Sequence, residues 1–294
     1  MSILSLIVDG NEFSLDDGTY CRLIGYDGWG SSPSQRQASQ GPQQHGDTDE
    51  GQFLKPRFGS LALKIMEAEL DQMYYRKQEL LDLFNPEASL ILKWYLPYGV
   101  RQFDCFYYED LSLGWDRGKW ATQNVGVVLK CPDPTCYDPS IFTLTWVGSS
   151  GSGGAFLVPW EVPTEVGGST FDDIQTVQYH GTWIEYPLIT IAGPAENLVI
   201  TNHTTGEKLD FTGLTLGAGE QRIIDTRYGF KTVLDEAGAN QIADLTDDSD
   251  LATFHIERKR PYETFRVNNI QAVASGVDSN TRVIIRYLER YTGK

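Results

Sequence analysis

The hydrophobic residues of this chain fall into short runs separated by turn-forming residues, most clearly over residues 181–233. Within that stretch the runs recur about every ten residues, with Gly, Pro, Asn or Asp between them. Residues 197–201 and 208–211 flank the sequence HTTG, in which Gly206 can adopt a positive φ at no steric cost. The pattern predicts a hairpin here and an antiparallel β-sandwich around it.

The first half of the chain adds one region of helical periodicity. Residues 57–66 alternate between apolar and polar positions, which predicts a half-buried strand. The period then changes to 3.6 over residues 68–84 and predicts the single convincing helix, which Asn85 and Pro86 end. The predicted helix face comprises Leu70, Met73, Tyr74, Lys77, Leu81 and Phe84. The other predicted strands are 3–8, 20–25, 89–96, 101–108, 120–129, 143–147, 156–158, 177–179, 222–226, 231–234, 253–257, 263–267 and 281–289.

Residues 28–52 contain almost no apolar side chain, and we expect a long polar loop that becomes ordered against a partner. His45 lies close in sequence to Asp47, Asp49 and Glu50, a spacing that suggests a metal cluster. No second ligand group lies nearby in sequence, so a solvated loop is the preferred interpretation.

Residues 181–233 also resemble the distal tail proteins of long-tailed phages, the siphovirus-type tail component family. The shared features, in order, are a strand ending in Pro, a GPxxN turn, a hairpin closed by TTGE, LxxGE, and IDTRYGxKTV. The N-terminal half resembles the same family more weakly, through a strand, one helix ending in FNP, a further hairpin and a strand that ends in a DPxxY segment. The closing RYTG resembles the family's ending.

This resemblance implies an all-β protein of two domains. Residues 1–138 would form an N-terminal β-sandwich or barrel-like ring domain with one α-helix, and residues 139–294 a C-terminal galectin-like β-sandwich. Three prolines between positions 132 and 139 independently indicate a boundary there.

The implied function is that of a structural hub at the distal end of the phage tail, assembled in the host cytoplasm. Six copies would form a ring that joins the tail tube to the tail tip or baseplate and lets DNA pass. The implied partners are the other copies of the chain, the tail-tube protein, the tape-measure protein, the tail-tip or baseplate hub protein and a receptor-binding protein.

Composition and charge agree with an all-β chain that does not bind nucleic acid. The chain has 15 Tyr, 13 Phe, 7 Trp and 29 Gly but only 3 Met, which favours strands over helices. A net charge of −16 repels DNA and anionic membranes, a property suited to a DNA conduit and equally to ordinary solubility. No apolar run reaches the roughly 18 residues of a membrane span, and the first residues do not form a secretory signal.

The four cysteines do not form a recognisable zinc site. Cys131 and Cys136 are separated by four residues, but no second Cys or His pair lies nearby to complete a tetrahedral site. In a reducing cytoplasm we expect free, half-buried thiols, while a disulfide between these two stays open.

No residue pattern predicts catalysis. Glu161 with Glu165, or Asp172 with Asp173, could form a carboxylate pair, but nothing in their surroundings predicts a raised pKa. The chain has no GxSxG sequence, and the acidic run 244–250 lacks the central Gly and the final Glu of a calcium loop. We therefore expect no enzyme activity, catalytic residue, cofactor or metal.

The alternative function is a carbohydrate-binding adhesion module that acts through the C-terminal sandwich. Such a site needs an exposed aromatic ring to stack on a sugar, and Trp160 and Trp183 are the candidates. Trp146 alternates into a strand and is expected in the core. A cell-wall hydrolase is the third hypothesis, which the lack of a catalytic constellation disfavours.

Overall fold

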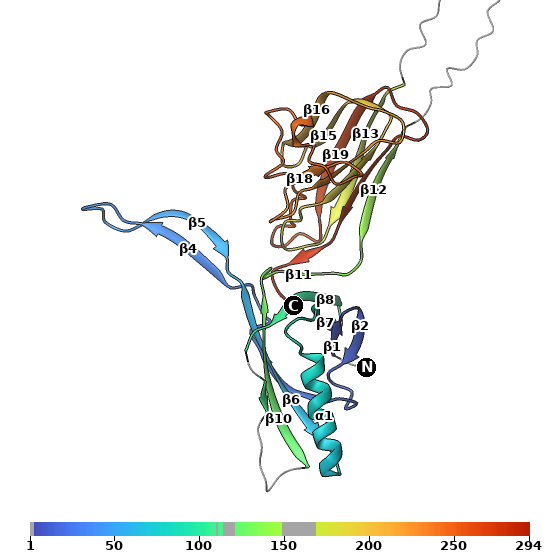
Figure 1. Cartoon of the computed structure of the whole chain (residues 1–294). Helices are drawn as coiled ribbons and strands as arrows, with labels where there is room; N and C mark the ends of the chain where they lie inside the picture. Colours follow the sequence, from blue (N-terminus) through green and yellow to red (C-terminus); the bar gives the residue numbers. More distant parts are fainter. Residues whose placement is uncertain (1–2, 110, 114–120, 149–168) are drawn as a thin grey trace, which may run out of the picture. The chain divides into compact units, whose positions relative to one another are not determined.

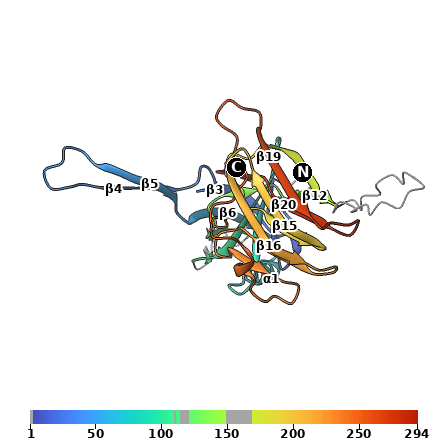
Figure 2. The same ribbon diagram turned by 90° about the horizontal axis from the view of Figure 1, so that it is seen from above.

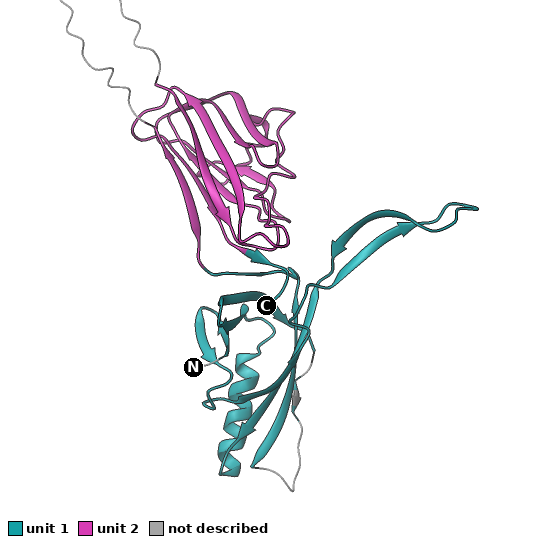
Figure 3. Ribbon diagram, turned by 180° about the vertical axis from the view of Figure 1, so that it is seen from behind, with its two compact units in different colours: residues 1–139, 290–294 teal, residues 140–289 magenta. Residues whose placement is uncertain are grey.

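The structure is a computed structural model that describes residues 3–109, 111–113, 121–148 and 169–294. It divides into two compact units (Figure 3). Unit 1 comprises residues 1–139 and 290–294, and unit 2 comprises residues 140–289. The chain therefore leaves unit 1, builds all of unit 2, and returns to unit 1 with residues 290–294. The sequence did not predict this return.

Unit 1 is an antiparallel sheet assembly with one helix. Its strands pair in the order β2–β1–β7–β8–β10–β6–β3, with β9 paired to β10, β11 to β8, and β21 to β11. Their bounds are β1 Leu4–Val8, β2 Asn11–Ser14, β3 Arg22–Asp27, β6 Arg57–Met66, β7 Leu90–Leu96, β8 Gly99–Tyr107, β9 Ser112–Leu113, β10 Thr122–Cys131, β11 Cys136–Tyr137 and β21 Arg290–Tyr291. Every second residue of β6 is buried, because successive side chains of a strand point to opposite faces. The prediction of a strand over residues 57–66 is confirmed.

Helix α1, Leu70–Leu83, is the single α-helix among the described residues, and it ends at Phe84 directly before Asn85 and Pro86 as predicted. Its predicted face is partly wrong. Met73, Leu80 and Leu83 pack into the core, whereas Tyr74 is 53% exposed. The apolar side chains of α1 spread over more than one face, so the sequence periodicity did not locate the buried one.

The polar stretch at residues 28–52 is not a loop without regular structure, and that prediction is wrong. The chain forms a two-stranded hairpin from β4, Ser34–Ser39, and β5, Thr48–Leu54, which we call the arm. The arm extends away from the sheet of unit 1 (Figures 1 and 2). All of its strand residues except Leu54 are exposed.

Unit 2 is a sandwich of two antiparallel sheets. One has the order β12–β20–β14–β17–β18 and the other β13–β19–β15–β16. The bounds are β12 Phe142–Val147, β13 Phe171–Tyr179, β14 Leu188–Ala192, β15 Ala195–Asn202, β16 Glu207–Leu216, β17 Gln221–Asp225, β18 Thr232–Leu234, β19 Arg266–Ser275 and β20 Arg282–Tyr287, with a short 3₁₀ turn η1 Ile242–Asp244. Both sheets contribute to one hydrophobic core, which includes Trp146 as predicted.

The predicted hairpin of unit 2 is confirmed: β15 and β16 pair from Asn202 and Glu207 outward, and Gly206 has a φ of +81°. Two strand predictions in unit 2 need correction. Residues 253–257 form no strand and contribute only the bridge between Ile256 and Glu185. The strand predicted over 263–267 instead begins at Arg266 and continues to Ser275. The strand predicted over 156–158 lies outside the described residues.

Candidate functional site

The arm contributes almost nothing to the core of its own chain. Its two strands pair from Ser34 with Leu54 to Ser39 with Thr48, and a register shift follows Gln37. The ion pair between Arg36 and Asp49 spans 3.7 Å, and both side chains are more than half exposed. An isolated two-stranded hairpin is marginally stable in water, and such an ion pair adds little. The outer edges of β4 and β5 have no strand partner among the described residues.

The arm is held at its base by Arg57, the first residue of β6. Its side chain is fully buried, and no carboxylate pairs with it in the described structure. All five N–H donors of the guanidinium are used. They are donated to the carbonyls of Pro134, Gly28, Gly30 and Thr292 and to the hydroxyl of Ser32, over 2.8–3.2 Å.

These acceptors come from three separate parts of the chain: the segment that enters the arm, the Pro134 region and the returning C-terminal segment. Burial lowers the pKa of Arg57, although a guanidinium remains charged at neutral pH. The Arg57 guanidinium also lies 5.1 Å from the centre of the Phe103 ring. We call Arg57 and its hydrogen-bond partners the root of the arm.

The root is tightly packed as well as hydrogen-bonded. The backbone N–H of Ser32 donates to the carbonyl of Thr292 over 2.6 Å, and Lys55 N–H donates to Pro33 across the base of the arm over 2.8 Å. A Cβ added to Gly293 would lie 2.1 Å from the carbonyl oxygen of Gly30, so this contact requires glycine. The two ends of the arm are therefore fixed, while its length is unsupported.

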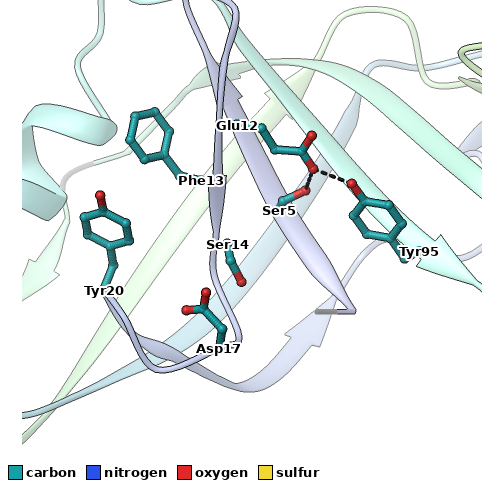
Figure 4. Close-up of a pocket in the computed structure, with 7 residues that line it drawn as sticks. All are labelled: Ser5, Glu12, Phe13, Ser14, Asp17, Tyr20 and Tyr95. Carbon is teal, nitrogen blue, oxygen red and sulfur yellow. Dashed lines mark hydrogen bonds between the residues drawn. The ribbon is translucent and has the colours of Figure 1, made fainter. Parts of the chain in front are cut away.

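A hollow elsewhere in unit 1 is lined by Ser5, Glu12, Phe13, Ser14, Asp17, Tyr20 and Tyr95 (Figure 4). Glu12 accepts hydrogen bonds from Ser5, Lys93 and Tyr95, the latter two on β7. Burial alone would raise the pKa of Glu12, but these hydrogen bonds and the charge of Lys93 outweigh it and lower the pKa. Glu12 is thus an ionised structural carboxylate that holds β2 against its neighbours.

The candidate metal ligands do not assemble. His45, near the tip of the arm, is exposed, and the described residues contain no group of three or more His, Cys, Asp or Glu side chains suited to a metal. Three of the four carboxylates of the acidic run 244–250 are already engaged: Asp244 pairs with Arg222, Asp248 pairs with Lys208, and Asp250 accepts from the Lys208 N–H. All four cysteines are free, and they are fully buried and not half-buried as predicted.

The carboxylates considered for catalysis do not form a site in the described structure. Asp172 and Asp173 lie on β13, where both side chains are exposed. Glu161, Glu165 and Trp160 lie outside the described residues. Trp183 is half-buried.

A small aromatic cluster in unit 2 was not predicted. Lys231 Nζ lies 3.9 Å from the centre of the Tyr186 ring, and the hydroxyls of Tyr186 and Tyr228 are 2.9 Å apart. Burial lowers the pKa of Lys231, and the charges of Asp225 and Glu207 oppose this shift. Tyr228 and Lys231 belong to the IDTRYGxKTV sequence, so this cluster gives that motif a structural role.

The chain was also compared with known proteins. It matches none of the protein-family models and none of the curated proteins. Among solved structures, it is similar to the Dit protein of phage SPP1, with a TM-score of 0.65 and 13% identity over 98% of this chain and 99% of that one. Chains of the phage p2 baseplate in its activated conformation, with strontium and with calcium, match with TM-scores of 0.49 and 0.48 and identities of 11% and 10%. Both matches cover 97% of this chain and 98% of the other.

The likeness to the SPP1 protein shows the fold of this chain along nearly its whole length. The prediction of an all-β protein with one helix is confirmed, and the predicted resemblance to distal tail proteins is confirmed at the level of the fold. In the described residues no helix is long and apolar enough to cross a membrane.

Proposed function

We propose that this chain is a structural virion protein, the distal tail hub of a long-tailed phage. Copies of the chain close into a ring, expected to be hexameric, at the distal end of the tail. The ring joins the tail tube and its tape-measure protein to the tail-tip or baseplate protein, and its outward-facing domains can hold a receptor-binding protein. The fold shared with SPP1 Dit, described as a paradigm of the hub adsorption apparatus in phages that infect Gram-positive bacteria, supports this function.

The exposed arm is the observation that supports assembly into a ring. It buries almost nothing in its own chain, yet Arg57 fixes its base with every donor satisfied. A hairpin this exposed gains stability when another surface covers it, either by side-chain packing or by strand addition at an open edge. In the ring, each arm lies against the neighbouring copy and is covered there.

The charge of the chain fits a conduit through which DNA passes without binding. Each copy carries a net charge of −16, and a ring of such copies repels phosphate groups. DNA is then cargo in transit and not a ligand.

Removal of the arm tests this function. Lys55 N–H already donates to the Pro33 carbonyl over 2.8 Å, so residues 34–54 can be replaced by a two-residue Asn-Gly turn without moving the root. Light scattering at several concentrations, with negative-stain imaging, measures assembly with and without purified tail-tube protein. We expect the intact chain to form a species near six times 33.0 kDa, and the armless variant to stay monomeric with an unchanged melting temperature.

A matched control removes an exposed charge outside the arm: Arg258→Ala should leave assembly intact. An intact chain that remains monomeric even with the tail-tube protein would contradict the ring. An armless variant that still forms rings would contradict the role of the arm.

A second candidate, carbohydrate binding by unit 2, is favoured by exposed aromatic side chains. Tyr228 and Phe230 lie on one loop and are 72% and 58% exposed, as required for stacking on a sugar ring. A glycan array probed with the full chain and with a Tyr228→Ala, Phe230→Ala variant tests this. Specific binding by the full chain that the double variant loses would support it.

A further inference from the structure

Cys105 on β8 and Cys131 on β10 bring their side chains together one step beyond the ladder between these strands. The backbone N–H of Tyr108 donates to the carbonyl of Val128, and the same register continues through the next two pairs of residues. One further step places Cys105 opposite Cys131. Hydrogen-bonded and non-hydrogen-bonded pairs alternate along an antiparallel ladder, so the cysteines occupy a non-hydrogen-bonded pair, where Cα atoms are about 4.5 Å apart. Disulfides require Cα separations of about 4.4–6.8 Å, which this position satisfies.

The two sulfur atoms are already in contact. They are 3.1 Å apart, both thiols are free, and the residues are 2% and 0% exposed. Cys105 Sγ also lies 3.3 Å from the carbonyl oxygen of Phe103, to which it can donate, and this leaves the thiol of Cys131 to donate to the Cys105 sulfur. A change in the side-chain torsions that brings the sulfurs about 1 Å closer is enough to reach bonding distance.

The other two cysteines of the chain are differently placed. Cys21 Sγ donates to the carbonyl of Leu15, and Cys136 Sγ to that of Tyr291. Each is therefore engaged by backbone and not by sulfur. Cys136 was the cysteine that the sequence suggested as the partner of Cys131, but the structure brings Cys105 to that position.

The junction that these cysteines would link has the fewest paired residues along the strand order β2–β1–β7–β8–β10–β6–β3. Strands β10 and β6 pair through all ten residues from Arg57 to Met66, whereas β10 and β8 pair at only two positions. A covalent bond one step beyond those two positions would join β8 to β10 next to their short ladder.

We propose that Cys105 and Cys131 are a disulfide-forming pair, which a water-sized oxidant of the hydroperoxide class closes once the protein leaves a reducing environment. One thiolate attacks a peroxide oxygen and breaks the O–O bond, which gives a sulfenic acid and hydroxide. The second thiolate attacks the sulfenic sulfur and expels its hydroxide, so that, with the two thiol protons, two thiols and one peroxide give one disulfide and two waters. The sulfurs are oxidised and the peroxide is reduced.

The reaction should be slow in the closed fold. Burial raises the pKa of Cys105 well above its usual value, and the neighbouring Cys131 thiol adds to this, so little reactive thiolate forms. Local opening at the short β8–β10 junction would admit both water and oxidant. We therefore expect this pair to remain reduced while the protein is in a reducing environment and to become oxidised later.

Thiol counting on the full chain tests this pair. The reduced protein is incubated with hydrogen peroxide, alkylated under denaturing conditions, and examined by intact mass and peptide mapping. We expect the loss of two of the four free thiols, a mass lower by two hydrogens, and one cross-linked peptide pair containing Cys105 and Cys131. The closed loop should raise the melting temperature of unit 1 by roughly 5–10 °C.

Two variants make the assignment specific. Cys131→Ser should abolish the cross-link, whereas Cys21→Ser, a buried cysteine of the same unit without a sulfur neighbour, should leave it unchanged. Peptide mapping of the natural sequence identifies the cross-linked cysteines even if Cys131→Ser folds poorly. A cross-link between Cys131 and Cys136, or four free thiols after peroxide treatment in mild denaturant, would overturn the proposal. Neither result depends on whether the chain forms rings.

Discussion

At the scale of single residues, Arg57 is a fully buried cation whose five donors all reach neutral acceptors. A buried cation without a carboxylate is costly unless every donor finds an acceptor, and here four carbonyls and one hydroxyl complete the set. The planar guanidinium offers five donors in fixed directions, which the compact ammonium of a lysine cannot reproduce.

Replacement of Arg57 should therefore be severely destabilising. Arg57→Ala leaves several buried acceptors without a donor, and we expect unit 1 to lose at least about 3 kcal/mol of its free energy of unfolding. Arg57→Lys should lose less, yet remain clearly below the natural protein. Urea denaturation followed by the fluorescence of the buried tryptophans measures both. The exposed Arg36→Ala is the control and should change stability by less than about 0.5 kcal/mol; an Arg57→Ala midpoint equal to that of the control would refute the role of the root.

Asp225, in the IDTRYGxKTV motif, makes stability depend on pH. Burial would raise its pKa, but hydrogen bonds from the side chain and backbone of Arg227, with its charge, outweigh burial and lower the pKa below the usual 3.8. A carboxylate with a depressed pKa contributes stability that is fully present above 3.8 and is lost as the pH falls through the lower, folded-state value. Asp225→Asn should therefore be less stable than the natural protein at pH 7, and the gap should narrow below pH 3.8. Urea midpoints at neutral and acid pH measure the difference in stability between the two proteins. A difference of the same size at both pH values would contradict this account.

At the scale of elements, the strands that bury one face were predictable and the arm was not. The alternation of residues 57–66 locates β6 because the burial of one face selects apolar residues there. Strands β4 and β5 bury neither face, so nothing in Ser34–Ser39 or Thr48–Leu54 alternates. The available signal was weak: Gly41-Pro42 and Gly46 mark a turn between two polar segments of similar length.

The root, Arg57 with its hydrogen-bond partners, could not be predicted either, and the reason is different. The partners of Arg57 are mostly backbone carbonyls, which every residue carries, so no residue type marks them. One of them, Thr292, is separated from Arg57 by all of unit 2. Only the folded arrangement brings them together.

The exposed arm should be the most rapidly exchanging hairpin of the isolated chain. Its ladder hydrogen bonds are open to water on both faces, so local opening costs little free energy. Hydrogen–deuterium exchange should show unprotected amides in β4 and β5 and strong protection in β6 and β10. On assembly the arm amides should become protected. Strong protection of the arm in the isolated monomer would show that it needs no partner.

At the scale of the whole molecule, the chain completes unit 1 with residues taken from its far end. Strand β21 pairs with β11, the Arg101 guanidinium lies 3.5 Å from the centre of the Tyr291 ring, and Thr292 accepts from Arg57 and Ser32. Unit 2 is thus an insertion between two segments of unit 1.

Two deletion variants test this arrangement. Tyr137 pairs directly with Arg290, so a short Gly-Asn-Gly linker can replace residues 140–289 and join Pro139 to Arg290. We expect this variant to fold as unit 1 alone. A second variant that ends at Pro139 lacks the returning segment, which leaves one Arg57 donor and the Ser32 N–H without their acceptor, and it should melt at least about 5 °C lower. Thermal unfolding by circular dichroism measures both, and equal melting temperatures would contradict a structural role for residues 290–294.

The return of residues 290–294 also determines when unit 1 is completed during synthesis of the chain. During translation, residues 1–139 emerge first, but Thr292 and Gly293 follow only after all of unit 2 has been synthesised, an interval of roughly 10–30 s at bacterial elongation rates. Until then Arg57 lacks one of its acceptors and the base of the arm stays incomplete. A prematurely terminated chain would carry an arm whose base lacks the Thr292 acceptor and the close contact of Gly293 with Gly30. The topology therefore makes completion of the base of the arm the last step in the synthesis of unit 1.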